Sequence, residues 1–455
     1  MLIRSRRDFM RDVVRSVSAA GALGMMGKFS EMNALAANGP YQALVCVYLA
    51  GGNDGHNTVI PLHTGIQGAD YATYQAGRQS MALPSAGLNV INNGNDVYGL
   101  HPKLVEMQGL YNSGKAAVLA NVGMLVKPTD RISYNTPGNS SVIPSALFSH
   151  SDQQSQWQTS NPTGLGSVGW GGGMADLLQN LNAGAPFPAT TSTNGSSIFC
   201  TGASTFPASV PPSGTPILTA SAAAAGGLQQ VLQFTNGMQL VQAANDNTKR
   251  GMNYANLLTN ALASVTINTP FPVNTEPVNP LAQQLLTVAR MIKARTTLGL
   301  TRQIFYCQLD GFDTHGNQLG DQDLLLQQLS QAVAAFQTAM HDELGVDQQV
   351  TLFTASEFGR TLNPNGSGGT DHAWGNHHFV VGGAVKGGQF YGQFPTLQLG
   401  SLVDANQRGT MIPTTSVDQY AATLAQWFGV PASQLGTLFP NLVKNFGGQT
   451  LGILG

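Results

Sequence analysis

The chain has 455 residues, enough for one large domain or two domains of ordinary size. Only 10% of the residues are charged, and the net charge is −2, which argues against a nucleic-acid partner or a membrane-surface partner. The three cysteines have no metal-ligand spacing, and their odd number excludes a complete disulfide framework. These totals indicate a globular protein whose surface is polar but sparsely charged.

The first 36 residues have the pattern of an export signal. The twin-arginine sequence S-R-R-D-F-M begins at Ser5, and the apolar run at 17–26 is too short to span a bilayer. The sequence A-L-A that ends at Ala36 offers a small-residue cleavage site. A basic amphipathic helix is the alternative interpretation. We expect the twin-arginine machinery to export residues 37–455 as one folded domain to the periplasm or beyond.

Residues 43–50 are a nearly continuous apolar run, which is typical of a central parallel strand. The run leads into G-G-N-D-G-H-N-T, whose glycines permit a tight turn. Asp54 therefore stands where the strand ends and is a candidate metal ligand. An Asx-turn or a helix N-cap is the equal alternative. His56 is a candidate for supporting such a site.

The next segments predict a short helix at residues 102–112 and a second buried strand at 116–122. A further helix begins within the sequence F-S-H-S, where Ser149 or Ser151 is placed to cap it. A helix N-terminus also stabilises a nearby anion or alkoxide, so this hydroxyl is a candidate nucleophile, with His150 beside it. The sequence does not separate the two serines.

The middle of the chain is less regular. Residues 183–227 are rich in Pro, Ser, Thr, Ala and Gly, which predicts an irregular insertion or lid with a short strand at 197–200. From Pro280 onward, apolar residues recur on one helical face, which predicts a regular helix.

A strand, a long amphipathic helix and another strand then follow at residues 303–309, 325–344 and 350–355. Such a crossover predicts neighbouring parallel strands whose ends share one edge of the sheet. Asp313 and His315 follow the first strand, and Glu357 follows the second. Together with a further strand at 379–383, this order predicts an α/β fold with a mostly parallel central sheet flanked by helices.

Carboxylates and imidazoles gather at these strand ends. The candidate metal ligands are Asp54, Asp313, His315, Glu357, Asp371 and His372. Mixed oxygen and nitrogen ligands suit divalent ions, and six ligands exceed one tetrahedral site, so we expect one or two ions of Zn, Mn, Mg or Ca. The alternative is a buried polar network in which Asp313 orients His315 and Glu357 pairs with Arg360. Of the adjacent His377 and His378, at most one should face the site.

Six motifs together resemble a known bacterial family. They are S-R-R-D-F-M, L-A-G-G-N-D-G-H-N-T, F-S-H-S, G-F-D-T-H-G-N-Q, S-E-F-G-R-T and G-T-D-H-A-W-G. The family is the twin-arginine-exported domain of unknown function 1501, and the resemblance extends to about Leu442. Its layout is similar to that of the alkaline phosphatase and sulfatase superfamily.

That resemblance implies a sheet between helical layers, with metals at its carboxyl edge. It implies the first metal aspartate at Asp54, the nucleophile at Ser149, an aspartate–histidine pair at Asp313 and His315, and a late histidine at His372. The pair is two positions apart here, where the superfamily usually has four. Glu357 replaces an Asp-His sequence of the phosphatases, and the formylglycine motif of sulfatases is missing from the sequence.

These residues lead to two hypotheses of different classes. The first is an exported metal-dependent hydrolase of a phosphate, sulfate or related ester, in which Arg360 binds the substrate oxyanion or pairs with Glu357. The second is a non-catalytic exported binding or assembly module that retains the fold. A transferase that uses the same serine is a third reading.

Overall fold

A computed structural model describes residues 40–65, 68–212, 214, 221–235 and 237–455. The predicted export signal at residues 1–36 lies outside them. The strands are β1 (Gln42–Ala50), β2 (Val59–Pro61), β3 (Asn89–Asn93), β4 (Asp96–Leu100), β5 (Ala116–Gly123), β6 (Thr190–Ser192), β7 (Ala208–Ser209), β8 (Arg302–Asp310), β9 (Val350–Ala355), β10 (Asn376–Gly382), β11 (Phe390–Gly392) and β12 (Thr415–Ser416). The helices are α2 (Gly55–Thr58), α3 (Tyr71–Arg78), α4 (Val105–Asn112), α5 (Arg131–Asn135), α6 (His150–Thr159), α7 (Trp170–Leu177), α8 (Ala222–Gln233), α9 (Gln239–Leu262), α10 (Pro280–Lys293), α11 (Gln318–Thr338), α12 (Val417–Trp427), α13 (Ala432–Leu438) and α14 (Pro440–Phe446).

One large sheet organises the described part of the chain. Its strand order is β11-β5-β10-β9-β1-β8-β6-β7, and β12 also pairs with β5. β10 runs antiparallel to β9 and β5, and the other pairs in this sheet are parallel. The predicted α/β fold with a mostly parallel sheet is therefore confirmed. β2, β4 and β3 form a smaller antiparallel sheet.

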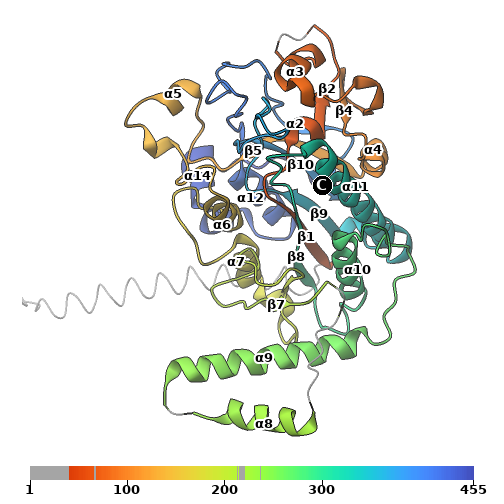
Figure 1. Cartoon of the computed structure of the whole chain (residues 1–455). Coiled ribbons are helices and arrows are strands. Elements are labelled where there is room, and N and C mark those ends of the chain that lie inside the picture. The colour runs from red at the N-terminus through yellow and green to blue at the C-terminus, as the bar shows by residue number, and fades with distance from the viewer. Residues whose placement is uncertain (1–39, 66–67, 213, 215–220, 236) are drawn as a thin grey trace, which may run out of the picture.

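Helices cover both faces of the large sheet (Figure 1). Successive side chains of a strand point to opposite faces, so Val45 and Val47 of β1 pack in the core formed with α4, α10 and α11. Cys46 and Tyr48 pack in the core formed with α6, α7 and α12. Burial on both faces explains why β1 reads as a continuous apolar run.

The crossover from β8 through α11 to β9 has the predicted direction, but its two strands are not neighbours. β1 lies between them and pairs in parallel with both. The prediction of adjacent strands is wrong because the crossover geometry fixes direction and not the number of strands that the helix passes over. The carboxyl ends of β1, β8 and β9 still share one edge.

Residues 183–227 contribute more to the fold than the predicted irregular insertion. They supply β6 and β7, which extend the sheet beside β8. The predicted strand at residues 197–200 is wrong, because this segment turns to meet the start of α7. There the carbonyl of Phe199 accepts a hydrogen bond from the N–H of Gly172 at 2.8 Å.

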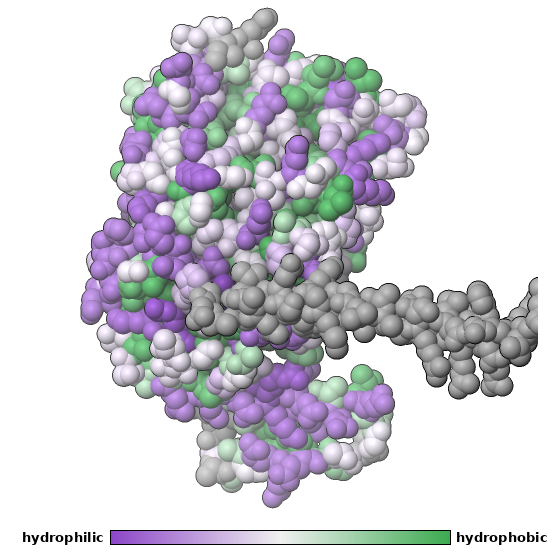
Figure 2. Space-filling model, turned by 180° about the vertical axis from the view of Figure 1, so that it is seen from behind, coloured by the Kyte–Doolittle hydropathy of each residue, from purple (hydrophilic) through white to green (hydrophobic). Residues whose placement is uncertain are grey.

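α8 and α9 lie side by side beyond this edge of the sheet (Figure 1). From behind, hydrophilic and hydrophobic residues are interspersed over the surface (Figure 2). Within the ranges that the structure describes, no helix combines the length and the apolar character that a membrane crossing requires.

Candidate metal centre

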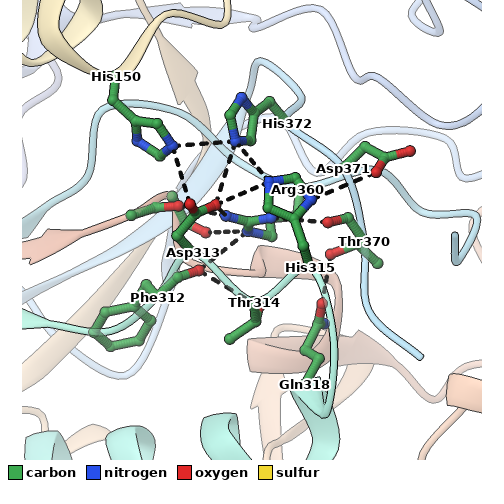
Figure 3. A network of polar contacts seen from close by, with 12 residues as sticks. His150, Phe312, Asp313, Thr314, His315, Gln318, Arg360, Thr370, Asp371 and His372 are labelled. Carbon is green, nitrogen blue, oxygen red and sulfur yellow. Dashed lines mark hydrogen bonds and ion pairs between the residues drawn. The ribbon is translucent and has the colours of Figure 1, made fainter. Parts of the chain in front are cut away.

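The site lies where the carboxyl ends of β1, β8 and β9 meet. Asp313 is in the loop after β8, and Glu357 is in the loop after β9. His372 precedes β10 and is bridged through the backbone to Arg360. His150 is the first residue of α6. Figure 3 shows the rings of His150 and His372 turned toward the carboxylate of Asp313.

His150, Asp313 and His372 form the candidate metal centre, because their possible ligand atoms all lie within 4.8 Å of one another. The Nε2 atoms of His150 and His372 are 3.1 Å apart. The Nε2 atom of His372 is 3.3 Å from Oδ1 of Asp313, and the Nε2 atom of His150 is 3.5 Å from Oδ2. Three segments that are far apart in the sequence thus bring one residue each to the same point.

Both rings are fixed so that Nε2 faces the centre. Nδ1 of His150 lies 2.9 Å from Oε1 of Glu357, and Nδ1 of His372 lies 2.9 Å from the carbonyl oxygen of Phe148. A carboxylate and a carbonyl only accept hydrogen bonds, so when either ring is neutral its proton is on Nδ1. Each Nε2 then presents its lone pair to the centre, as the second nitrogen of a metal-binding histidine does.

This donor set fits a divalent metal ion. Two unprotonated Nε2 atoms at 3.1 Å repel each other, so the contact is favourable only with a proton or a metal cation between them. A tetrahedral ion at about 2.1 Å from each donor separates the donors by roughly 3.4 Å, close to the observed 3.1, 3.3 and 3.5 Å. Two histidines and one carboxylate with an open position are typical of catalytic zinc sites.

His315 adds a further imidazole beside this group. Its Nε2 lies 3.0 Å from Nε2 of His372 and 3.1 Å from Oδ1 of Asp313. Its Nδ1 lies 3.6 Å from Oδ1 of Asp371. The structure therefore brings Asp313, His315 and His372 together, and it adds His150, which the sequence analysis placed beside the nucleophile.

The surroundings set the charge of the three ligands. Burial opposes ionisation of Asp313, but the hydrogen bond and charge of Arg360 outweigh it and lower the pKa of that carboxyl. The hydrogen bond to Glu357 is the largest influence on His150 and raises its pKa. Burial lowers the pKa of His372. At pH 7 Asp313 is therefore ionised and His372 is neutral, and these are the forms that bind a metal ion.

Arg360 is buried, with 0% of its side chain exposed, and it ties the loops of the site together. Its guanidinium donates to four carbonyls and one carboxylate, those of Gly51, Gly52, Phe312, Thr370 and Asp313. It thus pairs with Asp313, where the alternative interpretation paired it with Glu357. These acceptors give Arg360 a positioning role. Because the side chain is buried, the structure does not support the predicted contact between Arg360 and a substrate oxyanion.

Asp54 lies apart from the three ligands. It is the N-cap of α2, and its Oδ1 accepts a hydrogen bond from the backbone N–H of His56 at 3.0 Å, as the N-cap alternative predicts. Its Oδ2 forms a buried ion pair with Arg78 and accepts a hydrogen bond from Gln318. Neither partner stands at a strand end, so no signal in the sequence marked them. Asp54 is therefore not among the side chains that converge at the candidate centre.

The remaining predicted residues are not among the three ligands and have partners of their own. In addition to its contact with His150, Glu357 accepts a hydrogen bond from the N–H of Gly51 at 2.8 Å. Asp371 forms an ion pair at 2.8 Å with the exposed Arg408. No pattern in the sequence marked Arg408 as a partner of the site. Ser149 occupies the N-cap position of α6, and its hydroxyl donates to Asp152 at 2.5 Å.

The two adjacent histidines of β10 point apart, as the alternation of a strand requires. The ring of His377 stacks on Phe394 with centroids 4.8 Å apart. His378 is buried between Trp157 and Tyr420. These contacts place both rings in the packing around the strand and outside the group of three ligands.

Replacement of Glu357 by glutamine is expected to lower the pKa of His150 and to weaken metal binding roughly 10- to 100-fold. Glutamine keeps the shape of the side chain but removes the charge, and the hydrogen bond to Glu357 is the largest cause of the raised pKa. Histidine NMR titration of the metal-free protein measures the pKa, and calorimetry measures the affinity. Asp347→Asn is the control, because Asp347 contacts His341 at 3.0 Å, away from the centre. An unchanged pKa and affinity in Glu357→Gln would contradict this role.

The layered sheet and the two histidines and aspartate at its carboxyl edge define an α/β protein with a candidate metal centre. The chain belongs to the family described as "Protein of unknown function (DUF1501)", which it matches over residues 41–415. No curated protein matches it at a significant level. Among solved structures, it is similar to the C-terminal periplasmic domain of EcEptC from Escherichia coli in complex with Zn. The identity is 10%, the match covers 87% of this chain and 84% of that one, and the TM-score is 0.32.

Proposed function

We propose that the protein is an exported, metal-dependent hydrolase of phosphate, sulfate or related esters. The observation that carries the proposal is the convergence of His150, Asp313 and His372 with both imidazole rings fixed. A divalent ion of Zn, Mn, Mg or Ca held there would supply Lewis-acid stabilisation of negative charge on an ester oxygen. The resemblance of the family to alkaline phosphatases and sulfatases supports esters of phosphorus or sulfur as substrates.

The residues around the centre supply orientation and proton transfer. Ser149 stands at the N-terminus of α6, where the free N–H groups of the first turn stabilise an anion, so its hydroxyl would attack the ester or hold its anionic group. Asp152 accepts the hydrogen bond from this hydroxyl at 2.5 Å and is in position to take its proton. Arg360 orients Asp313 through their ion pair. When Ser149 attacks, the new serine ester forms as the alcohol of the substrate leaves. Water then cleaves the serine ester, which releases the free phosphate or sulfate and restores the hydroxyl.

The location follows from the N-terminal signal predicted at residues 1–36. Export by the twin-arginine machinery would deliver an already folded domain to the periplasm or the medium. This route allows a metal ion to be loaded before export.

Turnover of aryl phosphate and aryl sulfate esters tests the proposal. We expect the protein purified without chelators to hydrolyse at least one of these classes, to lose activity on chelation, and to regain it with about one equivalent of ion. Stoichiometric metal without hydrolysis of any ester would contradict the hydrolase. That result would favour a non-catalytic binding or assembly module, for which the departures from the superfamily spacing are the supporting observation.

A further inference from the structure

A separate cavity lies between α9 and the outer edge of the large sheet. It encloses about 310 Å³. The lining residues that matter here are Phe187, Phe206, Val210, Arg250, Tyr254 and Leu258. Phe187 precedes β6, and the lining runs from Phe206 through β7 to Val210. None of His150, Asp313 and His372 lines the cavity, so it is distinct from the candidate metal centre.

Arg250 brings a positive charge to this cavity. Its guanidinium carbon lies 4.3 Å from the centroid of the Phe206 ring. Its Nη1 is buried and meets no hydrogen-bond acceptor in the described part of the chain. Asp246, one turn earlier on α9, pairs with Lys249. A buried guanidinium nitrogen without an acceptor is unfavourable, so the arrangement suits a ligand that supplies one.

The walls around this charge are mainly apolar and aromatic. The rings of Phe187 and Tyr254 are 5.5 Å apart, and Leu258 is buried behind them. Phe206 is 50% exposed and forms the open side. A second cavity of about 220 Å³ shares Phe187, Phe206, Arg250 and Tyr254 with the first. Ser209 and Asn247 add polar groups to the lining. Mainly apolar walls with a few polar groups are typical of sites that orient a small molecule.

We infer that this cavity binds a small organic acid, a carboxylate carried on an aromatic body. The planar fork of Arg250 matches the two oxygens of a carboxylate. The rings of Phe187, Phe206 and Tyr254 supply faces and edges for an aromatic group. The site needs no contribution from the metal ligands.

Calorimetry of the full chain with 1-naphthoate and with neutral 1-naphthalenemethanol tests the inference. The wild-type protein is expected to bind one equivalent of naphthoate saturably. The Arg250→Gln variant should bind naphthoate at least about tenfold more weakly, because a charge-assisted bidentate contact is lost. Its affinity for naphthalenemethanol should change by less than about threefold, because the walls remain.

Arg295→Gln is the matched control, because Arg295 also stacks on an aromatic ring, that of Tyr41 at 4.9 Å, but donates to the carbonyl of Ile292. It should leave both affinities unchanged. Phe206→Leu should lower the affinity for both ligands. This variant tests the role of the cavity wall even if Arg250→Gln folds poorly. Binding should also persist in a His372→Ala variant, which separates this site from the proposed hydrolase. Failure of the wild type to bind naphthoate, or equal affinity in Arg250→Gln, would overturn the inference.

Discussion

His372→Ala is expected to remove the bound ion and to lower kcat/KM for ester hydrolysis about a thousandfold or more. The Nε2 atom of His372 contacts His150, His315 and Asp313. Its removal therefore deletes the ligand that lies next to all the others. Lewis-acid stabilisation contributes several kcal/mol to a transition state, and each 1.4 kcal/mol is about tenfold in rate. Elemental analysis of the purified variant and steady-state kinetics measure the two effects.

His63→Ala is the control for this experiment. His63 is half-buried beside the small sheet, where its Nδ1 lies 3.2 Å from the carbonyl of Val97. Its removal should leave metal content and turnover at the wild-type level. Wild-type metal content and turnover in His372→Ala would show that the activity does not depend on this centre.

Arg360→Met is expected to lower the free energy of unfolding by about 3–5 kcal/mol. The buried guanidinium joins the loops after β1, β8 and β9, and methionine leaves Asp313 and four carbonyls without this partner. Such a loss is a large share of the about 5–15 kcal/mol that stabilises a typical protein. Urea unfolding of the metal-free variant measures it without the contribution of a bound ion.

Arg408→Met provides the comparison. Arg408 is exposed and pairs with Asp371 at 2.8 Å, so its loss should cost less than about 1 kcal/mol. Arg360→Lys should be intermediate, because an ammonium keeps the charge but lacks the planar fork. Equal stability of Arg360→Met and Arg408→Met would contradict the positioning role of Arg360.

The strands were predictable because burial on both faces leaves a continuous apolar run. The predicted strand at residues 43–50 became β1 with one more residue at its start, and the predicted strand at 350–355 is β9. The rule that parallel strands end at one edge then brought Asp313 and His372 into one region. The proximity of His150 could not be predicted from this rule, because it depends on how α6 packs against the sheet.

The partners of the site could not be predicted from the chain order. Arg78 neutralises Asp54 from a helix, and the Phe148 carbonyl fixes His372 from a loop. Both contacts depend on tertiary packing between segments that no periodic pattern connects. Arg360 stood beside Glu357 in the sequence, yet the turn between them directs its guanidinium to Asp313. The motif S-E-F-G-R-T identified Arg360, and only the fold assigned its contacts.

Anomalous diffraction at the zinc absorption edge tests the metal centre most directly. Crystals of metal-free protein loaded with one equivalent of zinc are expected to show one peak about 2.1 Å from Nε2 of His150, Nε2 of His372 and a carboxylate oxygen of Asp313. A zinc peak elsewhere in the molecule, with none between these three side chains, would contradict the assignment of the site.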